Sequence, residues 1–301
     1  MFFLNNFVEF ELKIMDWINR LGNKFFDIFF YLISEFGGPI IIIAAIGIMY
    51  WCFNKEKGER LAYATITSVC LNGVLKSFVN RKRPFEHTGK EHLRRLKDSP
   101  LSDGATGTSF PSGHSQNAGS IYTTIALQYK KKWILSVCII FLVLIPISRL
   151  YLGVHFPSDV IVGLSLGIII AIVSYFLLNK FWNRKMIIYL LTILIFTPFI
   201  CLPIADHGFA QGYGLLIGFV GGVFVENKWI NFTNDVPPLK KIIRLLVGIL
   251  LVGSCFVLTR LIPDHIRHIK IITIIVYGLT SFVAIGIVPF TFKSTRHPNG
   301  I

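Results

Sequence analysis

The chain has 301 residues, of which 53% are hydrophobic and only 15% are charged, and its mean hydropathy is +0.63. This composition excludes an ordinary soluble domain, because long apolar stretches separated by short charged ones are typical of a polytopic helical membrane protein. The formal charge of +14 would suggest a nucleic-acid partner for a soluble protein. Here the cations flank apolar stretches, so we expect membrane lipids and no nucleic acid as partners.

The predicted elements begin with residues 1–24, which alternate apolar and polar side chains and therefore predict an amphipathic segment at the membrane interface. Apolar stretches long enough to be membrane spans follow. The predicted fold is an all-α, polytopic transmembrane bundle of about eight or nine spans, divided into the interfacial segment 1–24, a core 25–184 and additional helices 185–301. The expected spans are 25–53, 60–80, 114–129, 133–152, 156–179, 186–204, 209–226, 242–262 and 269–290.

The distribution of Lys and Arg predicts the orientation of these spans. The connections on one side of the predicted membrane hold 15 Lys and Arg residues, and those on the other side, apart from the 81–113 loop, hold only 6. The positive-inside rule therefore predicts a multi-pass plasma-membrane protein whose 81–113 loop faces outward. The seven cations of that loop would be explained by a catalytic need for positive charge, and the alternative is the inverted topology. The connections expected in the cytoplasm hold 15 Lys and Arg residues and lie near 54–60, 130–132, 180–185, 228–244 and 293–296.

Two runs of small residues predict places where helices approach each other closely. Gly163 and Gly167 form one run, and Gly214, Gly218 and Gly222 form the other. Small residues at four-residue spacing let helix backbones pack tightly in lipid. We therefore expect helix packing at both runs in preference to a ligand site.

The first candidate cluster is a basic run at the outer end of the 60–80 span. Lys76 lies at the end of this span, Arg83 follows seven residues later, and Pro84 ends the helix. A lysine that extends to the membrane surface beside an ordinary basic loop gives the same pattern. Alone, this cluster therefore does not separate phosphate binding from simple interfacial anchoring.

The second cluster, at residues 110–115, stands directly before an apolar span. Ser112 is a typical N-cap, and the backbone N–H groups of the next turn would lack helical partners. Such a helix start binds phosphate through its N–H donors and its dipole. Gly113 permits close approach, and His114 would lie beside a bound anion. A capped helix start with an incidental histidine is the alternative.

The third cluster lies where one span ends at Arg149 and the next begins near His155. Asp159 is four residues after His155, so a helical turn places both on one face. The carboxylate can then fix the imidazole tautomer and leave the other nitrogen as a nucleophile, while Arg149 offers a planar fork to phosphate oxygens. A lone His–Asp pair is more often structural, but Arg, His and Asp together at a membrane boundary are costly unless they are functional. With the spans above, all three clusters emerge on the same membrane face.

Together the clusters resemble the type 2 phosphatidic acid phosphatase family, which is similar at its active site to vanadium haloperoxidases. The family pattern K-x6-RP, PSGH and SR-x5-H-x3-D is intact and in order, with its parts starting at Lys76, Pro111 and Ser148. The resemblance covers roughly residues 60–170. The region after about 185 is additional to the family's common core.

The resemblance implies a role for each matching residue. His155 would attack phosphorus and become a phosphohistidine, Asp159 would orient His155 and stabilise its cationic form, and His114 would protonate the leaving lipid oxygen and later activate water. The resemblance implies no metal and no other cofactor. The residues implied to bind the phosphoryl oxygens are Lys76, Arg83, Ser112, Gly113 and Arg149.

Other ionisable residues of the 81–113 loop have simpler expected roles. We expect His87 and His92 to be solvated. The remaining basic residues of the loop are expected to attract anionic lipid headgroups. These residues are Lys90, Arg94, Arg95 and Lys97.

These inferences predict a membrane enzyme that hydrolyses a lipid phosphate or diphosphate ester at the outer face of the plasma membrane. The resemblance covers undecaprenyl pyrophosphate, phosphatidylglycerophosphate and phosphatidic acid as substrates, and extra C-terminal helices that could enclose a long tail slightly favour a polyprenyl lipid. One alternative is a phosphotransferase that uses the same phosphohistidine. Another is a non-catalytic lipid transporter, although anion binding alone would need the cations and not the histidines with their carboxylate. The sequence predicts no oligomeric state.

Overall fold

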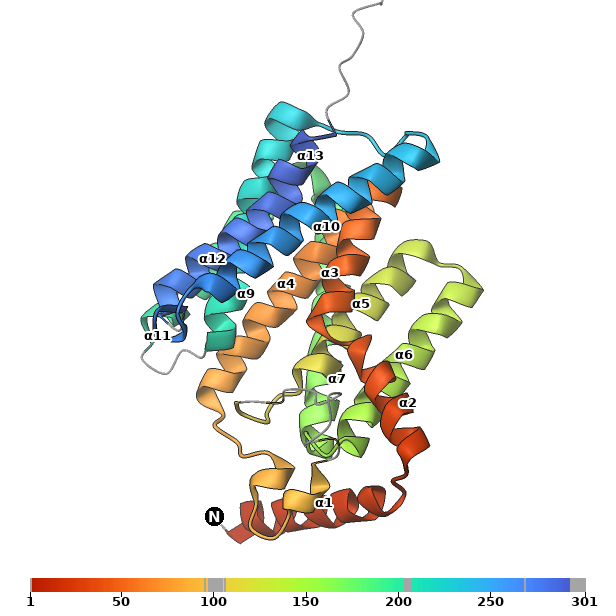
Figure 1. The fold of residues 1–301 in the computed structure, drawn as a ribbon, viewed down its shortest axis with the longest axis vertical. Coiled ribbons are helices and arrows are strands. Elements are labelled where there is room, and N and C mark those ends of the chain that lie inside the picture. Colours follow the sequence, from red (N-terminus) through yellow and green to blue (C-terminus); the bar gives the residue numbers. More distant parts are fainter. Residues whose placement is uncertain are drawn as a thin grey trace, which may run out of the picture.

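The computed structural model describes residues 2–94, 96, 105, 107–202, 207–267 and 269–292, and every regular element within these residues is a helix. The all-α fold predicted from the sequence is confirmed. The longer helices form one bundle, and α1 lies across its lower end (Figure 1). The helices are α1 Phe2–Arg20, α2 Lys24–Glu35, α3 Pro39–Ile48, α4 Lys55–Phe78, α5 Gly113–Tyr129, α6 Lys132–Tyr151, α7 Pro157–Lys180, α8 Lys185–Phe196, α9 His207–Val225, α10 Pro238–Leu261, α11 Asp264–Arg267, α12 Lys270–Phe282 and α13 Val288–Phe290.

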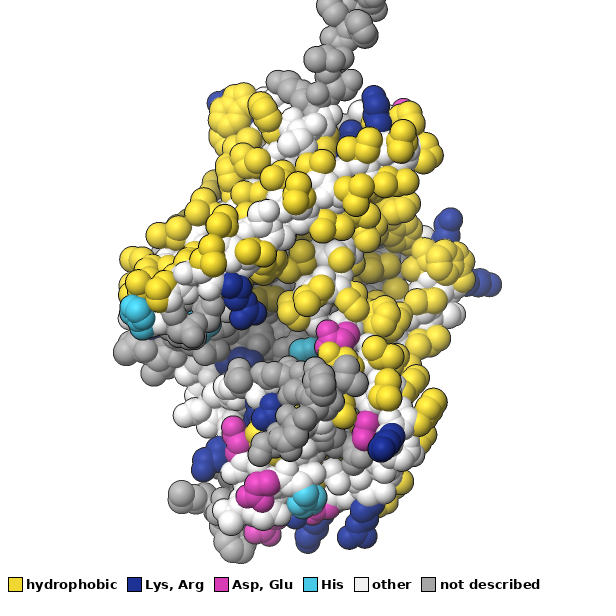
Figure 2. All heavy atoms as spheres, in the orientation of Figure 1, with side chains coloured by type: hydrophobic (Ala, Val, Ile, Leu, Met, Phe, Trp, Pro, Cys, Tyr) yellow, Lys and Arg dark blue, Asp and Glu magenta, His cyan; other side chains and the backbone are white. Residues whose placement is uncertain are grey.

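Six helical segments of the described chain are long and apolar enough to cross a membrane, and the bent pair formed by α2 and Pro39–Phe53 is a seventh candidate. The two other expected spans correspond to α4 and α5, which have 24 and 17 residues and pack inside the bundle. The prediction of eight or nine spans is roughly consistent with these six or seven candidates. Hydrophobic side chains cover the upper and middle parts of the visible face, and charged ones gather at its lower end (Figure 2).

Helix α1 is amphipathic, as the sequence predicts. Leu12 and Met15 are buried against the rest of the chain, whereas Phe10 and Trp17 are 60% and 63% exposed. Exposed aromatic side chains of this kind suit the boundary between lipid headgroups and acyl chains. One face of α1 therefore suits the membrane surface, and the other contacts the protein.

Close helix packing occurs at both predicted glycine runs. A Cβ atom on Gly167 of α7 would lie 2.1 Å from the carbonyl oxygen of Gln116 in α5, and one on Gly218 of α9 would lie 1.9 Å from that of Gly278 in α12. A larger residue at either place would push the two helices apart. The predicted packing role is confirmed, and the contact between α5 and α7 joins the helices that carry the second and third clusters.

The first candidate span, the pair formed by α2 and Pro39–Phe53, is bent by 46° at residues 36–38. A break inside a membrane leaves backbone carbonyls without helical partners, and these cost free energy unless a neighbour binds them. Here α5 supplies the donors, since Asn117 Nδ2 donates to the Gly37 carbonyl at 3.2 Å and the Tyr122 hydroxyl donates to the Phe36 carbonyl at 3.1 Å. A Cβ atom on Gly37 would lie 3.0 Å from the carbonyl oxygen of His114. Residues 36–38 therefore pack against the first turns of α5.

Helices α8 and α9 of the C-terminal region pack directly against α4. One apolar cluster joins Tyr63 of α4 to Tyr189 of α8 and to Phe209 and Phe219 of α9. The C-terminal helices therefore share a core with the segment that carries the first cluster. The division into three segments at residues 24 and 184 stays a prediction.

Candidate active site

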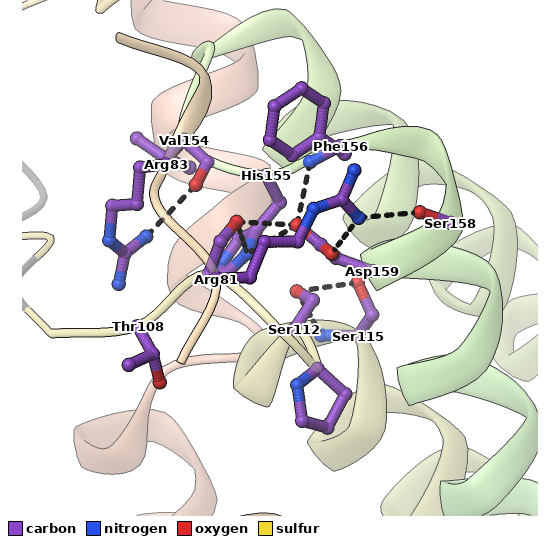
Figure 3. Close-up of polar contacts among 12 residues, drawn as sticks. Arg81, Arg83, Thr108, Ser112, Ser115, Val154, His155, Phe156, Ser158 and Asp159 are labelled. Carbon is purple, nitrogen blue, oxygen red and sulfur yellow. Dashed lines mark hydrogen bonds and ion pairs between the residues drawn. The ribbon is translucent and has the colours of Figure 1, made fainter. Parts of the chain in front are cut away.

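Two links bring the three predicted clusters together at one end of the bundle. The Ser112 backbone N–H donates to the Asp159 carbonyl at 3.0 Å and so joins the start of α5 to α7. Arg83 Nη1 donates to the Val154 carbonyl at 2.9 Å. The residues that follow α4 therefore lie beside both the start of α5 and the connection between α6 and α7 (Figure 3).

The short connection between α6 and α7 places His155. After α6 ends at Tyr151, Gly153 adopts a φ of +73° and the chain turns before α7 begins at Pro157. A Cβ atom on Gly153 would lie 1.8 Å from the carbonyl oxygen of Leu93. The position therefore requires glycine for both the left-handed backbone and the close approach. His155 consequently lies just before α7, with only 3% of its surface exposed.

Nδ1 of His155 faces the carboxylate of Asp159, with 3.8 Å between Nδ1 and Oδ2. The structure brings the two predicted residues together, but this distance exceeds a hydrogen bond. Oδ2 already accepts from the Phe156 backbone N–H at 2.9 Å and from the Ser109 hydroxyl. The carboxylate thus closes the first turn of α7 as well as facing the ring, and Nε2 is left on the side of the ring away from Asp159.

Arg81, which the family motifs do not include, binds the other carboxylate oxygen. Its Nη1 donates to Asp159 Oδ1 at 2.7 Å, and its Nη2 donates to the carboxylate of Glu11 in α1. The guanidinium lies 3.9 Å from the centroid of the Phe156 ring. The available sequence signal was its place in the basic run of the first cluster. Glu11 and Ser109 carried no signal, because neither belongs to a motif.

Each of the three predicted phosphate-binding cations donates a hydrogen bond to an uncharged oxygen atom. Arg83 and Arg149 are 5% and 2% exposed, and Lys76 is half-buried. Hydrogen bonds to carbonyl and hydroxyl oxygens help to orient these three side chains. The bonds run from Lys76 Nζ to Thr108 O (2.5 Å), from Arg83 Nε to Gly107 O (3.0 Å) and from Arg149 Nη1 to Ser34 Oγ (2.5 Å).

Ser112 forms the predicted N-cap of α5. Its Oγ accepts from the Ser115 N–H at 3.5 Å and from the Ser115 hydroxyl at 3.0 Å. Ser112 is fully buried, and its own N–H is bound to Asp159. Its observed role is therefore to tie α5 to α7. Direct phosphate contacts by Ser112 and Gly113 stay predictions.

His114 follows in the first turn of α5 and lies in a strongly cationic environment. The charges of Arg149, Arg83 and Lys76 act on it. All eight residues predicted for the site therefore lie in one region of the molecule, where the two histidines and the three cations are electrostatically coupled.

Burial lowers the pKa of His155 to about 3, because desolvation disfavours the imidazolium. Arg83 and Arg149 lower the pKa further, whereas Asp159 raises it. The ring is therefore neutral at physiological pH. A neutral imidazole has the free nitrogen lone pair that nucleophilic attack requires.

The His155 ring is expected to stay neutral as the pH falls from 7 to about 4. Because its pKa of about 3 lies below the ordinary 6.5, the unfolded chain binds this proton first. Its contribution to folding stability is therefore lost as the pH falls from about 6.5 towards 3. The measurement is 15N NMR of histidine-labelled protein in micelles, with the signal assigned by its absence in His155→Ala. Titration of this ring near pH 6.5 would contradict the expectation.

Within the described ranges, no group of three or more His, Cys, Asp or Glu side chains is arranged to hold a metal ion. Arg81 binds the carboxylates of both Glu11 and Asp159. Lysine and arginine side chains supply positive charge around His155 and His114.

Several side chains of the 81–113 loop contact α1 or the edge of the site. His92 is 55% exposed, as expected, but its Nε2 lies 3.2 Å from Asp16 Oδ1 of α1, and Lys90 Nζ lies 2.5 Å from Asp16 Oδ2. The expectation of a solvated His87 is wrong, because its half-buried ring packs edge-on against Phe156 at 5.8 Å. The predicted headgroup-attracting residues Arg95 and Lys97 lie outside the described residues.

A cavity of about 1090 Å³ lies at the opposite end of α4, lined by Lys55, Phe232 and Arg244 among others. Lys55 begins α4 and Lys76 lies in its last turn, so the helical rise separates them by about 30 Å. The residues that line this cavity include no histidine or cysteine. We therefore place the candidate active site at the end of α4 near His155 and not at this cavity.

Comparison with known proteins gives two family matches. The PAP2 superfamily model matches residues 59–183, which include all three clusters, and the model of the PAP2 superfamily phosphatase transmembrane extension matches residues 210–298. Most of the region that the sequence motifs left outside the common core, from residue 210 onward, therefore corresponds to a known extension of the same superfamily.

Relatives of the chain carry phosphatase names. It is 34% identical to phosphatidylglycerophosphatase B of Bacillus subtilis over 49% of this chain and 68% of that protein. It is 28% identical to an undecaprenyl-diphosphatase of Sulfolobus acidocaldarius over 56% of this chain and 78% of that protein. The crystal structure of Aquifex aeolicus LpxE is 31% identical, with a TM-score of 0.46 over 55% of this chain and 93% of that one. With its three motifs intact and gathered at one site, this chain belongs to the PAP2 superfamily.

Proposed function

We propose that this protein hydrolyses a lipid phosphate or diphosphate ester through a phosphohistidine formed on His155. The observation that carries the proposal is a buried, neutral imidazole that faces a carboxylate through Nδ1 and lies among cations. Anion binding alone would be served by the cations. A nucleophile with an orienting carboxylate is needed for covalent transfer of a phosphoryl group.

The first chemical step is attack of His155 Nε2 on phosphorus. A P–N bond forms while the P–O bond to the lipid breaks, and His114 donates a proton to the leaving oxygen. In the second step water attacks the phosphohistidine, and His114 accepts the proton from the water. Breakage of the P–N bond releases inorganic phosphate and regenerates neutral His155, so protons and atoms balance over the cycle.

The remaining site residues stabilise charge during both steps. Phosphoryl transfer depends mainly on positioning and on neutralising the charge spread over the equatorial oxygens. Lys76, Arg83 and Arg149 supply this charge, while Asp159 stabilises the cationic form of His155. Ser112 and Gly113 place the α5 N-terminus, with its dipole and N–H groups, beside the phosphoryl group.

The substrate class follows from a cationic site at the end of a bundle of apolar helices. The headgroup phosphate can reach the cations while an acyl or prenyl tail stays in lipid. Phosphatidylglycerophosphate, undecaprenyl pyrophosphate and phosphatidic acid are the candidates, and the names of the first two match those of relatives of the chain. The site is assigned to the extracytoplasmic face of the plasma membrane, because 15 Lys and Arg residues lie in the connections of the opposite side.

The test is phosphate release by the purified protein in micelles from a panel of these lipids, with and without EDTA. We expect release that EDTA does not reduce, because the cations and the α5 N-terminus supply the electrostatic stabilisation. Loss of activity that is restored only by an added divalent metal would contradict this mechanism.

The products decide between the alternatives. Stoichiometric inorganic phosphate and dephosphorylated lipid support hydrolysis. A phosphorylated acceptor with little free phosphate would instead identify a phosphotransferase. Movement of labelled lipid across vesicles without release of phosphate would identify a transporter and overturn the proposal.

A further inference from the structure

The amphipathic helix α1 places a carboxylate inside the site. Glu11 is 2% exposed although it belongs to a helix at the end of the bundle. One of its oxygens accepts from the Ser158 backbone N–H at 2.8 Å, and the other accepts from Arg81 Nη2. A carboxylate is buried in this way only where hydrogen bonds and an opposite charge compensate for lost hydration. Glu11 therefore belongs to a connected polar network.

Arg81 connects Glu11 to the catalytic pair. Its two terminal nitrogens bind two different carboxylates, Glu11 through Nη2 and Asp159 through Nη1. The planar guanidinium also lies over the Phe156 ring at 3.9 Å. The two carboxylates and the Phe156 ring together fix the orientation of the Arg81 guanidinium. The guanidinium in turn holds the Asp159 carboxylate opposite His155.

Helix α1 is itself held in place by contacts with the loop that carries Arg81. Asn19 Nδ2 donates to the His92 carbonyl at 3.3 Å, and Asp16 binds Lys90. Leu12 and Met15 form an apolar cluster with Leu93 and Phe156. These contacts hold α1 in the position that places Glu11 next to Arg81, and the opposite face of α1 remains exposed.

We propose that Glu11 is a positioning residue for the phosphohistidine reaction, acting through Arg81 to hold Asp159 against His155. The inference rests on the proposed function and extends it to the interfacial helix. Glu11 touches neither His155 nor the predicted phosphate-binding residues in the contacts described, so its effect should fall on turnover and not on substrate binding.

The test compares Glu11→Gln with Glu9→Gln, which removes the same charge from an exposed position on the same helix. Glu11→Gln should lower kcat about tenfold, since it weakens a charged hydrogen bond that preorganises the nucleophile. KM should stay within about twofold, and phosphoenzyme formation should slow in parallel with kcat. Glu9→Gln should match the wild type. An unchanged kcat in Glu11→Gln, or equal losses in the two variants, would overturn the inference.

A double-mutant cycle tests the route through Arg81. If Glu11 acts through Arg81, Arg81→Gln and the double variant Glu11→Gln/Arg81→Gln should lose activity to the same extent, within about twofold. Losses that multiply would show that Glu11 acts independently and would overturn the route. Thermal unfolding of each variant in micelles identifies any variant that does not fold. In that case Glu11→Asp, which keeps the charge and shortens the reach, replaces Glu11→Gln in the same comparison.

Wild-type protein and His155→Ala, measured in parallel, separate this inference from the proposed function. Phosphate release by the wild type that is absent in His155→Ala supports the function, whatever Glu11→Gln does. Binding of inorganic orthovanadate, a phosphate analogue that can bond to a nucleophile, provides a readout without turnover. Glu11→Gln should weaken orthovanadate binding about tenfold relative to Glu9→Gln, and identical binding would contradict the positioning role.

Discussion

Replacement of His155 by alanine is expected to abolish phosphate release, with a loss of about 10⁴-fold or more. The substitution removes the only atom proposed to form a bond to phosphorus, from a buried position beside Asp159. Lipid binding should survive, because Lys76, Arg83 and Arg149 remain.

The measurement is rapid quench with lipid labelled with 32P in its phosphate. Wild-type protein should show an acid-labile, base-stable phosphoenzyme, as expected for a P–N bond, and His155→Ala should show none. His265→Ala is the matched control, since it removes an exposed histidine of α11 far along the chain. Undiminished turnover or a persistent phosphoenzyme in His155→Ala would exclude His155 as the nucleophile.

Replacement of His114 by alanine is expected to slow hydrolysis of a lipid phosphate by about 10² to 10⁴-fold, the usual contribution of a general acid. The loss should depend on the leaving group. An alkoxide leaves slowly without a proton, whereas a nitrophenolate needs no protonation. We therefore expect an activated aryl phosphate to form the phosphohistidine at close to the wild-type rate in this variant.

Stopped-flow absorbance measures this second prediction. If His114 also activates water, His114→Ala should release one equivalent of nitrophenol in a burst and then turn over slowly, because the phosphohistidine accumulates. Asn117→Ala, one turn further along α5, is the control and should show no dependence on the leaving group. Equal losses for the lipid and the aryl phosphate would assign His114 a binding role and not proton transfer.

Hydropathy and motif spacing predict the bundle, the amphipathic α1 and the set of site residues. The bundle and α1 are predictable because they depend on neighbouring residues along the chain: apolar length defines a span, and Ser112 caps the helix that follows it. The Gly163–Gly167 run likewise predicts a close contact, which the approach of Gly167 to α5 provides. Local patterns thus determine which residues enter the site.

The connections among these residues could not be predicted, because they depend on how distant segments meet. In the sequence, Glu11 is only one polar position of an amphipathic helix. Its contact with Arg81 arises because α1 packs against the 81–113 loop. Ser109 precedes a motif, and only the structure shows that its hydroxyl donates a hydrogen bond to the Asp159 carboxylate.

The break in the first span limits how a lipid can approach His114. The carbonyls of Phe36 and Gly37 are bound by side chains of α5, and Ser34 accepts from Arg149. Outward movement of α2 would expose both carbonyls to hydrocarbon and remove a neutral anchor from a buried cation, which together cost several kcal/mol. The side of the bundle formed by α2 is therefore expected to stay in place, and the lipid is expected to enter from a different side.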